Sequence, residues 1–444
     1  MTISRFRSVT IPLLAIVGLA GRPLAAQDIL LTNVAIVDPD AETVRQGNLL
    51  IRDGKIAGFP SEAPAGFRGR VLDLRGKYVI PGLTDMHTHS FGNFSPSGPP
   101  MMMGPVGTAR ADLFVGVARF LDLFSPEDSI FAARERQRNG QAPGAEILAA
   151  GPCLTATSGH CSEYGVPTRI VDSPEDARRE VTALARQSPD VVKIVYDHAS
   201  YGGRSMPTVD RATMAAVIAT ARQLGLKTVV HVGTWQDVRD ATIAGAAAVT
   251  HTPFEGPPPD DLGGLMVEHG TYHIPTLAVQ SDYSRIVDDP TIVDSPLLVA
   301  QLGRDALAPF KQPIDSANRL QGWIAWQRRI APGNLAAVAT LAKAGVPMMT
   351  GTDAGNPAVF QGYSVHREMR LLVDAGLTPW QALAAATTVP GRFLGRSFGM
   401  APGDEGTVVV LDASPVADIR NTEAIALVIQ RGRVVDRDAL RWRR

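Results

Sequence analysis

The chain has 444 residues, of which 45% are hydrophobic and 20% are charged, and its formal net charge is -1. A chain of this length and composition can bury one large core and a smaller one, and nothing in it is typical of intrinsic disorder. The near-neutral charge and the lack of blocks of like charge disfavour binding to nucleic acid or to an anionic membrane, so the expected partner is a small molecule.

The first residues have the order of a signal peptide. Arg5 and Arg7 precede an apolar run over residues 11–20, and small residues end at Ala26 before a polar pair. This order is typical of export followed by cleavage, and the run is too short to span a bilayer well. We therefore expect residues 1–26 to be removed, leaving a periplasmic or secreted protein without a stable membrane anchor. A retained anchor is the alternative.

Short apolar or alternating runs at both ends of the chain predict a small β domain. The N-terminal strands are expected over 30–37, 48–52, 55–59 and 71–74, with a hairpin turn at Asp53-Gly54. The C-terminal strands are expected over 406–412 and 424–430, followed by a turn at 431–433. Because these segments flank a different middle, we expect one discontinuous domain formed by residues 27–80 and 396–444.

The middle of the chain alternates β-branched runs with helical stretches, which is the pattern of parallel βα units. Strands are predicted over 78–87, 118–123, 146–150, 191–196, 228–232, 247–251, 271–277 and 346–350, and helices over 173–187, 210–224, 235–244, 334–344 and 364–375. Eight such units predict an α/β fold, a (β/α)8 TIM-like barrel over residues 81–395. Two irregular stretches, 255–259 and 281–313, are expected to overhang its mouth.

His87 and His89 stand two residues apart at the end of the first predicted barrel strand. Because side chains alternate along a strand, both imidazoles can face one metal ion. A histidine pair of this spacing is nevertheless weak evidence when it stands alone, since histidine also serves in cores and on surfaces.

Further candidate ligands occupy the ends of later strands: Lys193, His231, His251 and, just past the last strand, Asp353. In a barrel the carboxyl ends of the strands converge on one mouth, however far apart they are in sequence. Each residue has an ordinary alternative, a core histidine for two of them and a turn or helix cap for the aspartate. Their joint occurrence at successive strand ends favours a common site.

Lys193 is unusual because it lies within the apolar run Val191 to Val195. A buried ammonium is costly and would repel metal cations. One interpretation is that the amine has reacted with carbon dioxide to give a carbamate, an anion able to bridge two metal ions. The other is that the lysine head reaches solvent at the strand end.

Four segments together make the chain resemble the amidohydrolase superfamily, and within it the imidazolonepropionase-like and prolidase-like (Xaa-Pro dipeptidase-like) branches. They are residues 79–89 (VIPGLTDMHTH), the strand-end histidines, the turn 350–355 (TGTDAG) and residues 375–379 (AGLTP). The resemblance covers about residues 30–436. It implies that the small domain is a β-sandwich formed by both chain ends, and that the protein is a metal-dependent hydrolase.

The resemblance also implies the ligand set of a centre with two divalent ions, zinc in most relatives. His87 and His89 would bind the more buried ion, and His231 and His251 the more exposed one. Lys193, as N6-carboxylysine, would bridge them. The substrate would be an amide, an N-acyl amino acid or a dipeptide-like molecule, cleaved at a C–N bond.

By the same resemblance, Asp353 would be both a metal ligand and the general base acting on a metal-bridging hydroxide. Two alternatives stay open. Imidazolonepropionases use one metal ion to open a cyclic amide and do not need Lys193, so metal content would separate the two readings. A catalytically silent scaffold is disfavoured, because the full set of ligands is present.

Residues near the predicted mouth are candidates for substrate binding, and the two cysteines are candidates for a disulfide. His160 follows the third strand, where relatives place a histidine that meets the substrate, and Tyr196 is a second candidate for substrate binding. Strand alternation turns Tyr196 away from the side of Lys193. Cys153 and Cys161 would share an oxidising compartment, where they form either a disulfide or a buried free pair. The sequence is also compatible with a homo-oligomer.

Overall fold

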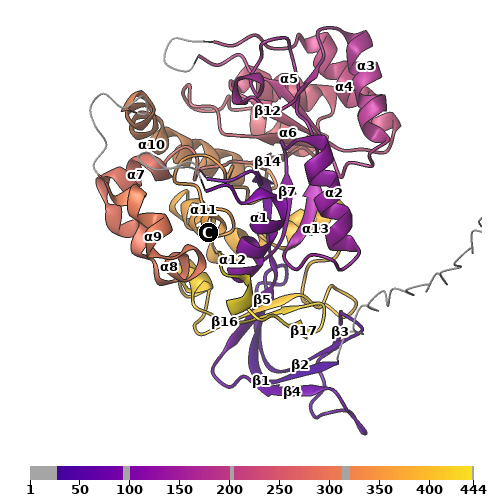
Figure 1. Cartoon of the computed structure of the whole chain (residues 1–444), viewed down its shortest axis with the longest axis vertical. Coiled ribbons are helices and arrows are strands. Elements are labelled where there is room, and N and C mark those ends of the chain that lie inside the picture. The colour runs from indigo at the N-terminus through magenta and orange to yellow at the C-terminus, as the bar shows by residue number, and fades with distance from the viewer. Residues whose placement is uncertain (1–27, 94–100, 201–204, 313–320, 443–444) are drawn as a thin grey trace, which may run out of the picture.

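The computed structural model describes residues 28–93, 101–200, 205–312 and 321–442, and the predicted signal peptide at 1–26 lies outside these ranges. The two chain ends meet in a small β domain that lies beneath a larger α/β domain (Figure 1). In the described part of the chain, no helix combines the length and the apolar character needed to cross a bilayer.

The small domain contains strands from both ends of the chain. They are β1 (Ile29–Asp38), β2 (Thr43–Arg52), β3 (Lys55–Gly58), β4 (Arg70–Asp73), β5 (Tyr78–Pro81), β15 (Val408–Leu411), β16 (Ile425–Gln430) and β17 (Arg433–Val434). The order is β17-β16-β15-β5-β1-β2-β3, with β4 also paired to β1. Because β15 pairs antiparallel with β5, the C-terminal strands extend the N-terminal sheet.

A bulge in β1 lets this sheet fold over its own core. Asn33 has a φ of 58°, and the pairing of β1 with β2 shifts register there. The first half of β1 pairs with β4 and the second half with β5. The core between these halves is built from the alternate apolar side chains Ile29, Leu31, Val34 and Ile36, among others.

The larger domain is a (β/α)8 barrel with parallel strands. They are β6 (Leu83–Thr88), β7 (Val117–Asp122), β8 (Glu146–Ala149) with its continuation β9 (Leu154–Thr155), β11 (Val192–Tyr196), β12 (Thr228–Val232), β13 (Ala248–Thr250), β14 (Tyr272–Ile274) and the extended segment 346–350. A short strand, β10 (Arg169–Ile170), pairs with β9. All eight predicted barrel strands are therefore present.

Backbone hydrogen bonds close the barrel where the ladders are short. The N–H of Met349 donates to the carbonyl of His273 at 2.8 Å, and the N–H of Met86 donates to the carbonyl of Thr350 at 2.8 Å. On the other side, β9 pairs with β11 at Ile194. These contacts join the last strand to the first and the third to the fourth.

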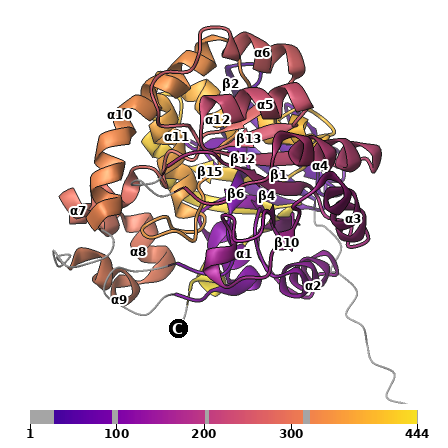
Figure 2. The same cartoon turned by 90° about the horizontal axis from the view of Figure 1, so that it is seen from above.

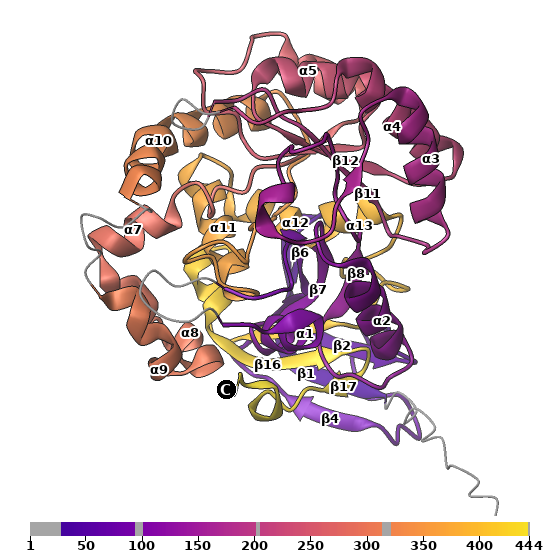
Figure 3. The ribbon, with the colours of Figure 1, turned by 45° about the horizontal axis from the view of Figure 1, so that its top comes forward.

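Helices surround the strands, as the views from above and from an inclined angle show (Figures 2 and 3). Their bounds are α1 (Gly104–Phe114), α2 (Glu127–Arg138), α3 (Pro174–Ala185), α4 (Arg211–Gln223), α5 (Trp235–Ala244), α6 (Leu262–His269), α7 (Asp282–Asp288), α8 (Pro296–Leu302), α9 (Arg304–Leu307), α10 (Gln321–Lys343), α11 (Tyr363–Asp374), α12 (Pro379–Ala385) and α13 (Thr388–Leu394). Several begin at capping residues legible in the sequence: Ser173, Asp210 and Thr234 each accept a backbone N–H three residues on.

An apolar layer fills the lower part of the barrel and forms a floor for the site. Each strand contributes to it, for example Met86 from β6, Val229 from β12 and Met349 from the last strand, and Phe393 of α13 packs against it. The next inward-facing residue of a strand, two positions further along, is often polar. Lys193 follows Val191 of this layer in this way, and His231 follows Val229. The site thus sits directly above a dry core.

Two sequence expectations are wrong in detail. The first predicted barrel strand, 78–87, is two strands: β5 belongs to the small sheet and β6 to the barrel. The break is at Gly82, where a Cβ atom would lie 2.6 Å from the Cβ of Ala118, so only glycine fits at this crossing. The stretch 281–313 is not irregular, because its described residues include the helices α7, α8 and α9, which local burial stabilises.

Candidate metal centre

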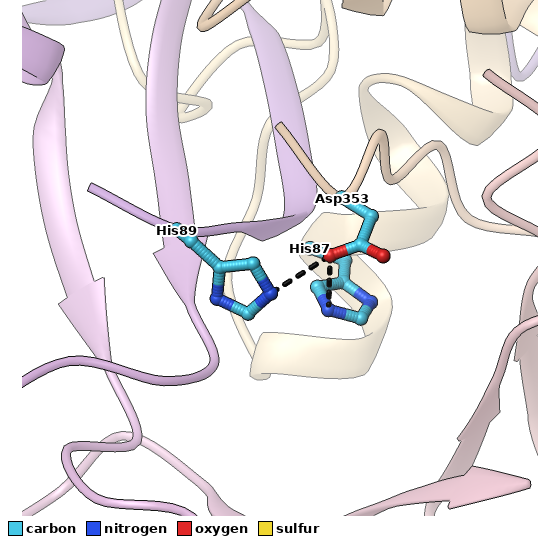
Figure 4. A group of neighbouring side chains, drawn as sticks. All are labelled: His87, His89 and Asp353. Carbon is cyan, nitrogen blue, oxygen red and sulfur yellow. Dashed lines mark ion pairs between the residues drawn. The ribbon is translucent and has the colours of Figure 1, made fainter. Parts of the chain in front are cut away.

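Three predicted ligands meet at the mouth of the barrel, although two lie at the start of the barrel sequence and the third lies near its end. Oδ1 of Asp353 lies 2.7 Å from Nε2 of His89 and 3.3 Å from Nε2 of His87 (Figure 4). The ligand atoms of the three side chains all lie within 4.8 Å of one another. Two imidazole nitrogens and a carboxylate oxygen at this spacing can bind one divalent ion.

A buried carboxylate, Asp85, holds two of these ligands together. Its Oδ1 accepts the backbone N–H groups of His87 at 3.0 Å and of Thr352 at 3.1 Å, and its Oδ2 accepts the Thr352 hydroxyl at 2.6 Å. The carbonyl of His87 in turn accepts the N–H of Asp353 at 2.7 Å. Burial raises the pKa of Asp85 to about 7. The strand that carries His87 and the turn that carries Asp353 are thereby fixed to each other.

Glycine is required between the last strand and Asp353. A Cβ at Gly351 would lie 2.3 Å from Cγ2 of Ile274 and 2.9 Å from the Cβ of His87. Asp353 itself has a φ of 59°, a left-handed conformation that aspartate tolerates better than most residues. The close approach of this turn to β6 explains the residue types in the 350–355 motif.

The other predicted ligands continue the cluster across the mouth. The ring centroids of His87 and His251 are 5.0 Å apart, and those of His251 and His231 are 4.3 Å apart. Nδ1 of His87 contacts the Thr250 hydroxyl at 2.7 Å, and Nδ1 of His251 contacts the Thr276 hydroxyl at 2.8 Å. These bonds orient both rings through Nδ1, so that Nε2 of each can serve as a metal ligand, the usual arrangement around a protein metal site.

Lys193 lies beneath this row of histidines. Its side chain is 2% exposed, and its Nζ has no hydrogen-bond partner in the structure. Burial lowers the pKa of Lys193. Burial also lowers the pKa values of His87, His231 and His251, and the charge of Lys193 lowers them further. An unpaired amine facing three neutral imidazoles is costly as an ammonium, whereas a carboxylated amine between two metal ions would be fully coordinated. The side chains of His87, His89 and Asp353 therefore fit a divalent ion, and the buried Nζ of Lys193 is left without a partner.

Asp197 also faces the centre, and the sequence reasoning did not identify it. Its Oδ2 lies 3.0 Å from Nε2 of His231, and it is buried. Gly233 makes room for it, since a Cβ there would lie 1.8 Å from its Oδ1. The sequence contains a signal for this residue, because Asp197 follows Lys193 by four positions and strand alternation turns both side chains toward the barrel interior.

The two residues predicted to bind substrate are placed differently. His160 lies at the edge of the cluster, with its ring centroid 4.8 Å from that of His231 and its Nδ1 2.6 Å from Oε1 of Glu163. Although burial opposes its charge, the bond to Glu163 and nearby acids raise the pKa of His160 to about 9. Tyr196 faces the helices instead, where its hydroxyl donates to Asp240 at 3.0 Å, so the structure does not bring it to the cluster.

Comparisons with known proteins match these features to one family. The model of the amidohydrolase family matches residues 78–435. An uncharacterised protein of Mycobacterium tuberculosis is 26% identical over 359 residues, which make up 81% of this chain and 83% of that protein. A solved structure named as a candidate prolidase, from Bifidobacterium longum, is 26% identical, with a TM-score of 0.72, and the match covers 94% of this chain and 98% of that one.

A solved Xaa-Pro dipeptidase gives a TM-score of 0.75 at 19% identity, covering 92% of this chain and 99% of that one. At this level of identity the likeness shows the shared fold alone. The barrel with its β-sandwich domain is therefore the fold of this chain and of the solved relatives.

Proposed function

Because the chain belongs to the amidohydrolase family, we propose that it is a hydrolase with two divalent metal ions that cleaves a C–N bond in an amide, an N-acyl amino acid or a dipeptide-like substrate. The observation that carries the proposal is Lys193, whose buried Nζ has no hydrogen-bond partner and whose charge would lower the pKa values of three nearby histidines. A carboxylated lysine there would supply the anion that two metal ions require, and a centre with one ion would leave the amine buried without a function.

The ligands divide between two ions in the proposed centre. His87, His89 and Asp353 would hold one ion, and His231 and His251 would hold the other. Lys193, as N6-carboxylysine, would supply an anionic ligand to both. When bound, two zinc ions would polarise the scissile carbonyl and lower the pKa of the attacking water.

Asp353 is the proposed proton carrier. Its Oδ1 already contacts both imidazoles of the HxH pair, and its side chain is 11% exposed, so a water or a leaving amine can approach it. The carboxylate takes the proton of the attacking water and returns it to the leaving nitrogen, which then departs as a neutral amine rather than as an unstable anion. One residue thus acts as base and then as acid.

We further propose that the protein is exported, with residues 1–26 as its cleaved signal peptide. The order of charge, apolar run and small residues supports this proposal. Expression in a bacterial host, cell fractionation and N-terminal sequencing test it. A mature protein in the periplasm or medium that begins near Gln27 is expected, and an uncleaved protein in the cytosol would contradict export.

The hydrolysis proposal is tested by a substrate screen with a matched inactive variant. Metal-replete protein is assayed with Xaa-Pro and other dipeptides, N-acyl amino acids, lactams and lactones, and Asp353→Asn is assayed in parallel to remove contaminating activities. Hydrolysis of an amide by the wild type, but not by Asp353→Asn, supports the proposal. A protein that hydrolyses lactones but no amide would overturn the proposal that it cleaves a C–N bond.

Metal content separates the proposal from the alternative with one ion. Elemental analysis of the purified protein is expected to give close to two divalent ions per chain. A content near one, together with opening of a cyclic amide, would instead support the mononuclear reading of the site.

A further inference from the structure

The two cysteines of the chain lie in contact beside the candidate metal centre. The Sγ atoms of Cys153 and Cys161 are 2.7 Å apart, and both side chains are buried. They pack with Phe124 and with Val195, which stands two residues after Lys193 on β11. Both thiols therefore lie at the side of the barrel interior that holds the metal ligands.

The cysteines connect a rigid element to a loop that reaches the site. Cys153 directly precedes β9, which pairs with β11 at Ile194 and so belongs to the barrel wall. Cys161 directly follows His160, whose ring lies 4.8 Å from that of His231. A covalent bond between the two sulfurs would therefore attach the His160 end of the loop to the wall.

Asp172 holds the start of this loop by accepting the N–H and the hydroxyl of Thr157 at 2.8 and 2.6 Å, whereas the side-chain hydrogen bonds at the Cys161 end are local. Nδ1 of His160 contacts Glu163, and the hydroxyl of Ser162 donates to the carbonyl of Gly159, so these bonds stay within the loop. Cys161 has a φ of 85°, a left-handed conformation that residues with a side chain rarely adopt. A conformation of this kind persists where surrounding contacts determine it, and the sulfur contact is one of them.

We propose that Cys153 and Cys161 form an intramolecular disulfide in the mature protein, and that this bond holds His160 against the metal centre. The effect on His160 rests on the proposed function of the site, whereas the bond itself does not. The oxidant is a protein or small-molecule disulfide. In the first exchange step one cysteine thiol attacks the S–S bond of the oxidant and forms a mixed disulfide. In the second step the other cysteine displaces the oxidant and forms the S–S bond between Cys153 and Cys161. The oxidant takes up two protons and two electrons and is released as two thiols.

Thiol mapping tests the bond without any assay of activity. The full chain is equilibrated with oxidised or with reduced glutathione, unfolded in N-ethylmaleimide, digested and examined by mass spectrometry. A peptide pair linked through Cys153 and Cys161 is expected from the oxidised sample, and two maleimide adducts from the reduced one. Two adducts from the oxidised sample would overturn the proposal.

Stability gives a second readout of the bond. Closing a loop of this length lowers the entropy of the unfolded chain, and reduction is expected to lower the melting temperature of the wild type by about 3 °C. The Cys153→Ala/Cys161→Ala double variant, which keeps small apolar side chains at both buried positions, is expected to melt at the same temperature in both redox buffers. An equal shift in the variant would assign the effect to the buffer and contradict the bond.

Steady-state kinetics test the effect on His160. Reduction is expected to raise KM by about threefold or more, since the substrate must then pay to order the loop, and to leave kcat within about twofold. The double variant is expected to show the raised KM in both buffers. A linked peptide with an unchanged KM would leave the disulfide intact and overturn its role in holding His160.

Discussion

Nε2 of His89 lies 2.7 Å from Oδ1 of Asp353, and this contact joins the end of the first barrel strand to the turn after the last. The same carboxylate oxygen lies 3.3 Å from Nε2 of His87. The barrel brings together groups that the sequence separates by most of the domain, because the carboxyl ends of its parallel strands share one edge. Four experiments test the site and the framework that supports it.

Asp353→Asn is expected to lower kcat by at least about a hundredfold, because the amide cannot accept a proton from the attacking water. Stopped or continuous assays on the substrate found in the screen measure the loss. Asp261→Asn serves as the matched control, since Asp261 is an exposed carboxylate paired with Arg239 on the surface. Turnover within about threefold of wild type in Asp353→Asn would contradict its role as proton carrier.

Lys193→Ala is expected to lose most of the bound metal, because the alanine cannot supply the bridging anion. Added acetate or propionate should restore part of both metal content and activity, by occupying the space of the carboxylated side chain. Lys343→Ala, at an exposed position on α10, provides the control. A Lys193→Ala protein that retains its full metal content without added carboxylate would exclude the bridging role.

Much of this fold follows from patterns of local sequence. The barrel strands were predictable because runs such as Val191 to Val195 are short, rich in β-branched residues and, apart from Lys193, apolar. The ligand positions followed from one rule about strand ends, which also explains Asp197. Asp197 is harder to identify from the sequence because it lies one residue past the end of β11, outside the apolar run that marks the strand.

Other features depend on contacts that no local pattern records. Helix α1 begins after Met103 without a side-chain cap, and α8 begins at Pro296 without one. Each is short, and its burial against the rest of the domain compensates for weak local signals. The break at Gly82 is likewise set by the approach of Ala118 from the next strand. Such elements become predictable only once the barrel around them is known.

Asp85 is a positioning residue, and its removal should act through the ligands it holds. Asp85→Ala removes the carboxylate that accepts the N–H of His87 and the hydroxyl of Thr352, while the N–H of Thr352 keeps the His87 carbonyl at 3.0 Å, so we expect metal affinity to fall by about 10–100-fold. Titration of the metal-free protein with zinc measures the change. Asp85→Asn keeps an oxygen for both N–H groups and should recover much of the affinity. Equal affinities for Asp85→Ala and wild type would show that the turn is held by other contacts.

Glu405 should stabilise the junction of the two domains in a pH-dependent way. It contacts Arg119 at 2.8 Å, Arg396 at 3.1 Å and the Thr407 hydroxyl at 2.7 Å. Although burial opposes its charge, these partners lower the pKa of Glu405 to about 2. Because the folded pKa lies below that of the unfolded chain, near 4.3, the stabilisation is complete above about pH 5 and is lost as the pH falls toward 2.

Glu405→Gln is therefore expected to lower the free energy of unfolding by about 3 kcal/mol at pH 7, and by progressively less as the pH falls from 5 to 3. Urea unfolding of both proteins across this range measures the difference. Glu62→Gln, at an exposed position of the small domain, should match the wild type throughout. A difference that stays constant from pH 7 to pH 3 would mean that the Glu405 carboxylate is not the source of the stabilisation, and that the buried Arg119 is neutralised by other groups at this junction.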